Sequence, residues 1–417
     1  MNAPRPRRAA VTGVGVIAPN GSSTETFWKS TREGISVLDR VTREGCEHLP
    51  LRVAGQVRDF DPSAAIEERF LVQTDRFTHF AMGAADLALD DARLPRSETD
   101  NAPFSVGVVT AAGSGGGEFG QRELQQLWGK GSRYVGPYQS IAWFYAASTG
   151  QISIRRGFKG PCSVVAADEA GGLDALAHAA RAVRRGTDVI VAGSTEAPIA
   201  PYSVVCQLGY EELSTADDPA RAYRPFTSSA CGFVPAEGGA MVVVEAEEMA
   251  LARGARVRAH LAGHAATFTG ASRWEESAEG LAQAVRGALA EAECAPEEID
   301  VVFADALGVP SADRAEALAL ADALGAHGTR VPVTAPKTGI GRGYCAGPLM
   351  DVAAAVLSME HGVIPPTPNV FDICHDLDLV TGRARTAEVR TALVLSRGLM
   401  GSNSALVLRH GATGASS

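Results

Sequence analysis

Residues 164–179, VVAADEAGGLDALAHA, form the segment best suited to chemistry. Its apolar start is typical of a strand, its middle of a sharp turn and its Ala-rich end of a helix. Such an elbow lifts a side chain to a helix N-terminus, where the positive end of the helix dipole activates a nucleophile. The apex here is Asp168-Glu169, and neither carboxylate is a useful acyl acceptor. The segment therefore predicts a turn of the kind that presents a catalytic nucleophile, but with no nucleophilic side chain at its apex.

The cysteine and histidine residues indicate no second reactive centre. The seven Cys residues are odd in number and contain no CxxC pair, which predicts a reducing cytoplasm without disulfides or a zinc site. The nine His residues show no HxxH or HExxH spacing, so we expect neither a metal nor a cofactor. Cys162 begins the elbow strand and Cys345 follows a Gly-rich turn; we expect both to be small buried side chains rather than nucleophiles.

Composition predicts a globular protein that binds neither nucleic acid nor membranes. The chain has 417 residues, 46% hydrophobic and 21% charged, which is enough for a large core. Its net charge is -10 and its only basic tract is residues 5–8, which disfavours nucleic acid. No segment is long and apolar enough to span a bilayer. A signal peptide is the rival interpretation of residues 5–21, but the apolar run is short and Gly-broken, so we predict a first strand.

The elements that must position the elbow recur in a weak half-chain repeat. In each half, a β run leads into a Gly-rich turn and an Ala-rich amphipathic helix, and a pair of strands closes the half. On the elbow helix, one apolar face is formed by Leu173, Leu176, Ala177, Ala180 and Val183. Alternating strands and helices predict an α/β fold with mostly parallel, buried sheets. Two packed copies, residues 8–255 and 256–410, predict α/β/α/β/α layers.

Three further stretches are candidates for interaction surfaces. Residues 37–75 and 213–235 are long and polar, and loops of that length are usually functional or interfacial. Residues 118–157 have a helical pattern and hold an aromatic cluster, Trp128, Tyr134, Tyr138, Trp143, Phe144 and Tyr145, in a chain that is only 6% aromatic. The cluster fits a subunit interface, where aromatic residues are enriched, and it fits an ordinary core; both interpretations stay open.

Several segments together resemble the β-ketoacyl synthases of the thiolase superfamily. They are AAVTGVGVIAPNG near the start, the elbow and helix at 161–186, PFTSSACGFVPAEGGAMVVVE at 225–245, residues 336–365 and the closing GLMGSNSALVLRH. The similarity covers about residues 8–410. Within that superfamily the phrases VVFADALGVPSADRAEA, PARAYRPF and EFGQRELQQLW resemble the chain-length factors, the ketosynthase β subunits of bacterial type II polyketide synthases. The resemblance implies a thiolase-like fold of two pseudo-repeated halves.

The resemblance also locates three catalytic positions, and all three carry other residues here. A condensing ketosynthase has Cys in a C-x-x-G-L-D-A pattern, and Glu169 stands at that position. Its first His opens an H-G-T-G-T motif, which matches residues 305–309 and places Asp305 there. Its second His ends a K-S-x-x-G-H pattern, in which this chain keeps Lys337 and has Arg342 in place of the His.

These three substitutions predict a retired active site. Condensation needs a thiolate that holds the growing chain as a thioester and neutral imidazoles that donate hydrogen bonds to the developing enolate. Glu169 forms no stable thioester, an ionised Asp305 only accepts hydrogen bonds, and Arg342 cannot shuttle a proton. We expect Arg342 to form an ion pair with one or both carboxylates, with a residual chemical role as the alternative, and Lys337 to be an internal strut.

The resemblance implies a partner and a task. In that family this subunit pairs with a catalytic ketosynthase α subunit as a heterodimer, and the growing poly-β-ketoacyl chain enters a channel at their interface. Acyl carrier protein is then reached through the partner. The channel residues matched here are Thr110, Gly113, Ser114, Gly117, Tyr202 and Ser203, and the interface residues are Phe119, Trp128, Trp143, Phe144 and Tyr145, together with the strand at 106–112.

Gly117 is the position that predicts product size. In relatives that stop at shorter chains, a bulky aromatic residue stands there, so Gly117 predicts a long, aromatic polyketide, with Tyr202 as a candidate end wall. The alternative is that the glycines of 113–117 only form a tight turn.

Two other functions compete with this one. A malonyl-acyl-carrier-protein decarboxylase that primes polyketide synthesis would be expected to keep both His residues. A lone condensing enzyme would need the Cys. The sequence therefore favours a subunit that is not catalytic alone.

Overall fold

The computed structural model describes residues 7–96, 104–270 and 273–411, and most of its strands form two half-sheets. The first half-sheet contains β1 (Ala9–Ile17), β4 (Val106–Ala111), β5 (Cys162–Val165), β6 (Val189–Glu196) and β7 (Gly238–Ala246). The second contains β8 (Ala259–Phe268), β9 (Val301–Phe303), β10 (Pro332–Thr334), β12 (Asp378–Leu379), β14 (Thr391–Arg397) and β15 (Ser402–His410). They meet where β1 and β8 pair over Ala10↔His260 and Val11↔Ala259. Two small ribbons pair β2 (Asp39–Arg40) with β3 (Val53–Ala54), and β11 (Val363–Ile364) with β13 (Arg385–Thr386).

The half-chain repeat is confirmed by the strand order. The first half-sheet runs β5-β4-β6-β7-β1 and the second runs β10-β9-β14-β15-β8, with β12 added at its edge. In both, the first two pairings are parallel and the last two antiparallel. The prediction of mostly parallel sheets was therefore wrong, because each half closes with a pair of adjacent antiparallel strands. All eight residues of β6 and all nine of β7 are buried, so these strands lack the alternation that usually indicates antiparallel pairing.

Twelve α-helices lie among the described residues, and the long ones form three layers around the half-sheets. They are α1 (Thr24–Arg32), α2 (Glu68–Leu71), α3 (Arg76–Asp91), α4 (Gly117–Lys130), α5 (Gln139–Ala142), α6 (Ala147–Arg156), α7 (Gly171–Arg184), α8 (Pro201–Gln207), α9 (Glu247–Ala252), α10 (Ala278–Glu291), α11 (Pro310–Leu324) and α12 (Gly347–His361).

The central layer consists of α7 and α12. Both helices contact strands of both half-sheets, and their apolar residues share one core cluster with β1, β7 and β14. Thirteen of the fifteen residues of α12 are buried, as expected for a helix that is covered on all sides. α3 packs on the outer face of the first half-sheet, and α10 and α11 lie on that of the second. The predicted α/β/α/β/α arrangement is confirmed.

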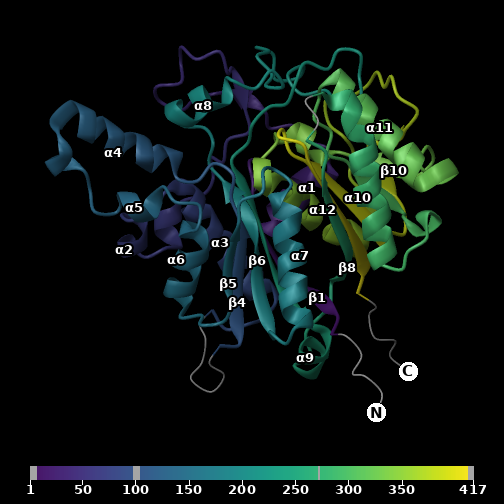
Figure 1. Ribbon diagram of the computed structural model, residues 1–417, viewed down its shortest axis with the longest axis horizontal. Helices are drawn as coiled ribbons and strands as arrows, with labels where there is room; N and C mark the ends of the chain where they lie inside the picture. The colour runs from purple at the N-terminus through teal and green to yellow at the C-terminus, as the bar shows by residue number, and fades with distance from the viewer. Residues whose placement is uncertain (1–6, 97–103, 271–272, 412–417) are drawn as a thin grey trace.

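The elbow lies between β5 and α7, at one edge of the first half-sheet. β5 has β4 as its only neighbour strand among the described residues, whereas β4 lies between β5 and β6. The expectation that the strand at 106–112 forms an interface is therefore corrected: β4 is interior, and β5 is the strand whose outer edge is unpaired. In Figure 1, α4 projects beside this region, at the side of the molecule away from α10 and α11.

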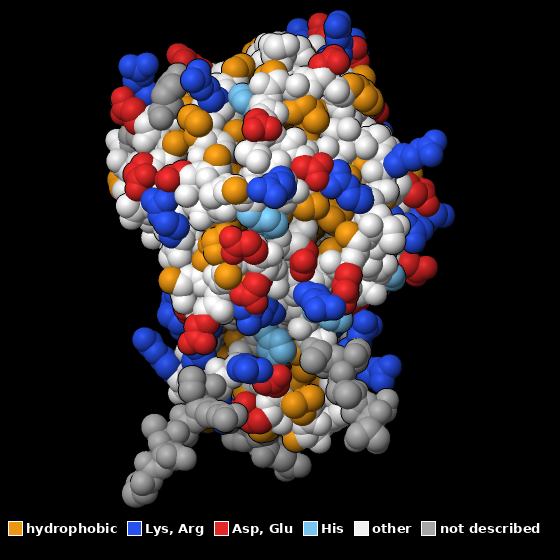
Figure 2. Space-filling model, turned by 90° about the vertical axis from the view of Figure 1, so that its right-hand side faces the viewer, with side chains coloured by type: hydrophobic (Ala, Val, Ile, Leu, Met, Phe, Trp, Pro, Cys, Tyr) orange, Lys and Arg blue, Asp and Glu red, His pale blue; other side chains and the backbone are white. Residues whose placement is uncertain are grey.

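The aromatic residues on and after α4 are largely exposed. Trp128 is 83% exposed, and Trp143, Phe144 and Tyr145 are 47%, 48% and 36% exposed. On the face shown in Figure 2, by contrast, hydrophobic side chains form small areas separated by charges of both signs. The core interpretation of the aromatic cluster is thus excluded for this chain on its own. Phe119 is the exception, because its side chain is buried inside the chain and cannot be a surface anchor.

The two long polar stretches contribute core residues as well as surface. Residues 37–75 contain β2, β3 and α2, and residues 213–235 bury Tyr223 and Phe233 in the same apolar cluster as Leu51 and Val53. Across the described ranges, no helix has the length and apolarity needed to cross a membrane.

Candidate active-site remnant and channel

The elbow keeps the strained backbone of a nucleophile turn. Asp168 has φ 52°, a left-handed conformation that costs most non-Gly residues free energy. The turn is held from two sides, because the Met400 amide donates to Asp168 Oδ2 at 2.8 Å and Cys345 Sγ donates to the Asp168 carbonyl at 2.8 Å. The strain therefore lies one residue before Glu169. Cys345 is buried as predicted, whereas Cys162 is exposed on the edge strand, contrary to prediction.

Glu169, Asp305 and Arg342 come together as one buried ion cluster, although they are up to 173 residues apart in the sequence. Arg342 Nε donates to Glu169 Oε2 at 2.8 Å and Arg342 Nη2 donates to Asp305 Oδ1 at 2.8 Å. All three side chains are at most 4% exposed. The predicted ion pair thus forms with both carboxylates, and the guanidinium also donates to the backbone carbonyls of Asp305 and Arg397.

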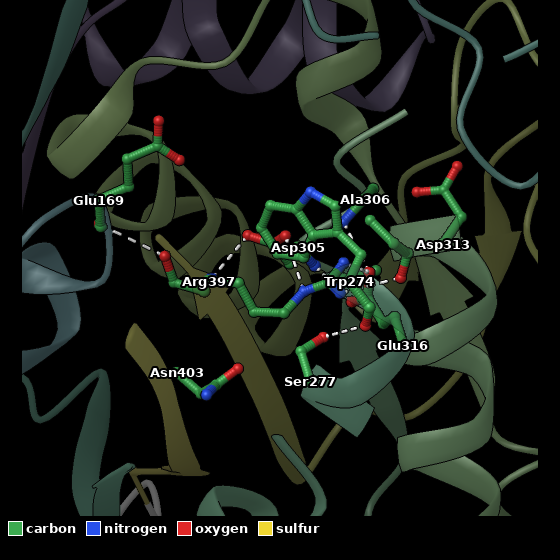
Figure 3. Close-up of polar contacts among 12 residues, drawn as sticks. Glu169, Trp274, Ser277, Asp305, Ala306, Asp313, Glu316, Arg397 and Asn403 are labelled. Carbon is green, nitrogen blue, oxygen red and sulfur yellow. Dashed lines mark hydrogen bonds and ion pairs between the residues drawn. The ribbon is translucent and has the colours of Figure 1, made fainter. Parts of the chain in front are cut away.

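A second arginine in this cluster was not predicted from the sequence. Arg397, at the end of β14, is fully buried, and its Nε and Nη2 atoms lie 3.1 Å from Asp305 Oδ2 and Glu316 Oε2. Figure 3 shows its guanidinium between these carboxylates and the Trp274 ring, whose centroid is 5.3 Å away. The signal in the sequence was a cation that ends the apolar strand TALVLSR, since a charge is rarely buried without partners.

The two carboxyl groups of the cluster have opposite pKa shifts. Burial alone would raise the pKa of Asp305, but the charges of Arg342, Arg397 and Lys337 outweigh it and lower that pKa to about 2. Burial raises the pKa of Glu169 to about 7, against the attraction of Arg342. Glu169 Oε1 is buried and has no hydrogen-bond partner among the described residues. Asp305 is therefore a fixed anion, whereas the pKa of Glu169 lies near neutral pH.

Lys337 is part of the framework beneath the cluster. Its Nζ atom lies 2.6 Å from Asp351 Oδ2 of α12 and donates to the carbonyls of Ala304 and Asp305 at 2.7 and 3.2 Å. These bonds tie the segment after β9 to the central helix layer. The predicted role of an internal strut agrees with this geometry.

The cluster lacks the groups that condensation needs. Both oxygens of Asp305 accept hydrogen bonds, from the guanidinium groups of Arg342 and Arg397 and from the Arg397 backbone amide, so the residue offers no donor to an enolate. Burial raises the pKa of the Cys345 thiol well above its ordinary value, which disfavours the thiolate. No group of three or more His, Cys, Asp or Glu with metal-binding geometry occurs in the described part of the chain.

A cavity of about 560 Å³ extends from the elbow to the small-residue run at 112–117. Its walls are Ala112, Gly113, Ser114, Gly117, Tyr145, Ala166, Asp168, Glu169, Pro198, Tyr202, Ser203, Cys206, Gln207, Tyr210, Tyr344, Cys345 and Leu399. Five of the six channel residues matched in the sequence lie on it. Thr110 does not: it is buried in β4, and its hydroxyl pairs with that of Thr149 at 2.6 Å.

Gly117 is needed for close packing rather than for a special backbone conformation. It begins α4 without a positive φ, whereas Gly115 has φ 62° and makes the turn. A Cβ atom on Gly117 would lie 2.1 Å from Ser203 Oγ, so any larger residue must push Ser203 and project beside α8. The tight-turn interpretation therefore fits Gly115, whereas Gly117 allows the start of α4 to approach Ser203 closely at the cavity wall. Tyr202 lines the same cavity but is 51% exposed.

Glu196 is a second residue that the sequence did not single out. It ends β6 fully buried, and its carboxylate accepts hydrogen bonds from the Gly113 and Ser114 amides and from the Ser114 hydroxyl. Burial raises the pKa of Glu196 to about 7. These contacts fix the wall of the cavity opposite α8. The signal was an acidic residue at the end of the apolar run VIVAGSTE.

Comparison with known proteins identifies the family. The family models described as "Beta-ketoacyl synthase, N-terminal domain" and "Beta-ketoacyl synthase, C-terminal domain" match residues 7–250 and 258–371. The chain belongs to the β-ketoacyl synthase family. Among its relatives, a polyketide beta-ketoacyl synthase 2 of Streptomyces halstedii is 75% identical, with 98% of each chain covered. The tetracenomycin polyketide synthase ketoacyl synthase beta subunit of Streptomyces glaucescens is 50% identical, with 99% of this chain and 100% of that one covered.

Solved structures support the same placement within the β-ketoacyl synthases. The ishigamide ketosynthase/chain length factor has a TM-score of 0.87 at 27% identity, covering 97% of this chain and 99% of that one. A type II polyketide synthase acyl-carrier protein complex with its ketosynthase bound to the hexaketide has a TM-score of 0.86 at 27% identity, covering 98% and 100%. The resemblance to ketosynthase β subunits and the thiolase-like fold are both confirmed.

Proposed function

We propose that this β-ketoacyl synthase chain is the chain-length subunit of a type II polyketide synthase and is not catalytic alone. It pairs with a ketosynthase α subunit in the cytoplasm and sets the length of the poly-β-ketoacyl chain through a channel at their interface. The observation that carries the proposal is the cluster of Glu169, Asp305 and Arg342, because the three catalytic positions bind one another instead of a substrate. The halves at 8–255 and 256–410 are the units that we propose for the pseudo-symmetric pairing.

The partner surface is the edge of β5 together with the exposed aromatic residues near α4. An unpaired strand edge can pair with another chain, and Trp128, Trp143, Phe144 and Tyr145 supply the aromatic anchors typical of stable interfaces. An obligate pair would bury roughly 2,000–5,000 Å² in total. Because this chain carries a net charge of -10, we expect the acidic acyl carrier protein to dock mainly on the ketosynthase.

Channel length is set where Gly117 faces Ser203. The channel residues in this proposal are Gly113, Ser114, Gly117, Tyr202 and Ser203, since Thr110 lies outside the cavity. A channel acts as a ruler because each added two-carbon unit must fit, and a side chain across the path costs overpacking energy. With no side chain at Gly117 and a 560 Å³ cavity behind it, the product should be a long aromatic polyketide.

Substitution Gly117→Phe tests this proposal. The ring would displace the Ser203 side chain and project into the cavity that both residues line, so the heterodimer should release a product shorter by one or more two-carbon units. The measurement is the product mass after co-expression with the cognate ketosynthase.

Gly129→Phe is the matched control, because Gly129 lies on the same helix with nothing within 4 Å of its Cβ position. That variant should keep the wild-type length if the heterodimer elutes intact. Unchanged length in an intact Gly117→Phe complex would contradict the proposal.

A malonyl-acyl-carrier-protein decarboxylase is the alternative function, and the cluster disfavours it. Decarboxylation requires donors aimed at the thioester carbonyl, yet Arg342 directs its donors to Glu169, Asp305 and the Arg397 carbonyl.

A further inference from the structure

One cavity connects two regions of the chain that have different proposed roles. One end is the small-residue run with Gly113, Ser114 and Gly117, where the proposed channel enters, and the other is the retired elbow with Asp168 and Glu169. Its volume of about 560 Å³ falls within the range of ligand pockets, roughly 300–1,000 Å³. The loss of the catalytic residues has therefore not filled this space.

Several polar groups on the cavity wall have no partner in the described part of the chain. The hydroxyl groups of Tyr202, Ser203 and Tyr210 make no hydrogen bond to another described residue, although all three line the cavity. Glu169 Oε1 is buried and unpaired at the elbow end. Burial, followed by the charges of Glu169 and Asp168, raises the pKa of Tyr210, so its hydroxyl keeps its proton and can donate. Because Tyr202 and Tyr210 are exposed, their hydroxyl groups can exchange water for the acceptors of a ligand in the cavity.

The charges and apolar residues of the wall restrict the chemical class of that ligand. The carboxyl groups of Asp168 and Glu169 face the cavity and no Lys or Arg lines it, which disfavours an anion. Ala112, Ala166, Pro198 and Leu399 line the cavity together with the hydroxyl groups. The wall thus suits a neutral ligand that has both hydrogen-bond acceptors and apolar segments.

We propose that the retired elbow is the far wall of the channel, and that its cavity binds the first-formed, starter-unit end of the growing poly-β-ketoacyl chain. This inference rests on the proposed function and adds a second binding subsite to it, with Tyr210 and Cys206 on its wall. Gly117 then acts as the open entrance, and the elbow decides where extension stops.

Cys206 offers a way to shorten the subsite without touching the entrance. It lies on α8 one turn beyond Tyr202 and Ser203, it lines the cavity, and it is exposed rather than packed in the core. A larger side chain there should occupy the elbow end of the cavity at little cost in folding.

The experiment reconstitutes the complex with its ketosynthase, carrier protein and malonyl-carrier protein, and measures product mass for Cys206→Trp and the smaller Cys206→Leu. Cys206→Trp should lower the share of full-length product by about tenfold, because overpacking opposes the last extensions, and Cys206→Leu should do so less. Cys374→Trp is the matched control, since Cys374 is exposed on a turn that does not line the cavity. If the Cys206→Trp complex fails to assemble, the product mass of the Cys206→Leu complex tests the proposal instead.

The outcomes separate this inference from the proposed function. If Gly117→Phe shortens the product but both assembled Cys206 variants release the wild-type length, the starter-end subsite is wrong and the chain-length function stands. If neither position affects length in an intact complex, both proposals are wrong. Shortening at both positions, with Cys374→Trp unchanged, supports the subsite.

Discussion

At the residue scale, the site that we propose to be retired holds two carboxyl groups that share one guanidinium. Asp305 has Arg342, Arg397 and Lys337 nearby and remains ionised, whereas Glu169 shares Arg342 with Asp305 and faces like charges from Asp168 and Asp305. Breaking a buried pair by removing one partner typically costs about 3–5 kcal/mol. Removal of any one partner would therefore leave a buried charge unpaired beside the elbow, although the cluster contains none of the groups that condensation requires.

The raised pKa of Glu169 predicts a pH-dependent stability. Between its ordinary pKa of 4.5 and the folded value of about 7, the folded protein holds a proton that the unfolded chain has released. The free energy of unfolding should therefore fall as pH rises through this window, by up to about 1.4 kcal/mol per pH unit for one proton. In Glu169→Gln the amide oxygen can still accept from Arg342 but cannot ionise, so this loss should disappear.

Urea unfolding of the wild type and of Glu169→Gln at pH 5, 6, 7 and 8 measures this difference. Glu196 and Asp313, whose pKa values burial also raises to about 7, are present in both proteins and cancel. The wild type should lose stability relative to the variant as pH rises. Parallel stability curves would show that Glu169 is ionised throughout.

At the scale of elements, the sequence predicted which segments form the strands and helices around the elbow. It predicted less well whether neighbouring strands pair in parallel or antiparallel. The half-chain repeat, the elbow helix and the five layers followed from apolar runs, glycine turns and the 3.6-residue period of Leu173, Leu176 and Ala180. The antiparallel closing strands did not, because β6 and β7 are buried on both faces and show no alternation. The interior place of β4 also depended on strand order, which local pattern does not encode.

The residues of the candidate site that lie in recognisable motifs were predicted from the sequence. Those that only tertiary contacts bring to the site were missed. Glu169, Asp305, Lys337 and Arg342 lie in recognisable motifs, and they meet as expected. Arg397 and Glu196 stand at the ends of ordinary-looking strands, and their partners come from segments 81–92 residues away. Phe119 was misjudged because it lies on the same helix as the exposed Trp128, while its own side chain is buried.

The aromatic segment after α4 leads to a prediction about binding to the ketosynthase. The Phe144 ring contacts Trp143 edge-on and Tyr145 at a tilt, with centroid distances of 6.1 and 6.3 Å, and all three side chains remain exposed in the isolated chain. Trp143→Ala should weaken binding to the ketosynthase by tenfold or more, because buried Trp anchors commonly contribute about 2 kcal/mol. Isothermal titration or size-exclusion chromatography would measure it.

Phe371→Ala is the comparison for that variant, since Phe371 is 71% exposed and lies outside the aromatic segment. It should leave association unchanged. Equal effects of the two substitutions on association, or no effect of Trp143→Ala, would show that the interface with the ketosynthase lies elsewhere.

At the scale of the whole molecule, the fold supports a cavity whose shape, rather than any reactive group, carries the proposed function. The fold of a β-ketoacyl synthase is retained, with its layers and strained elbow, and the three positions that we propose to match its reactive groups form a salt-bridge cluster. What remains accessible is a cavity that begins beside Gly117 and ends at Glu169. The account assigns the covalent chemistry to the ketosynthase and the geometry of the growing chain to this subunit.

Intact-mass spectrometry of the heterodimer tests this division of roles most directly. The complex is incubated with malonyl-carrier protein, quenched, and the two subunits are weighed separately. We predict added acyl mass on the ketosynthase alone, with this chain at its unmodified mass. Acyl mass on this chain, or carbon dioxide released by this chain in the absence of the ketosynthase, would contradict the account.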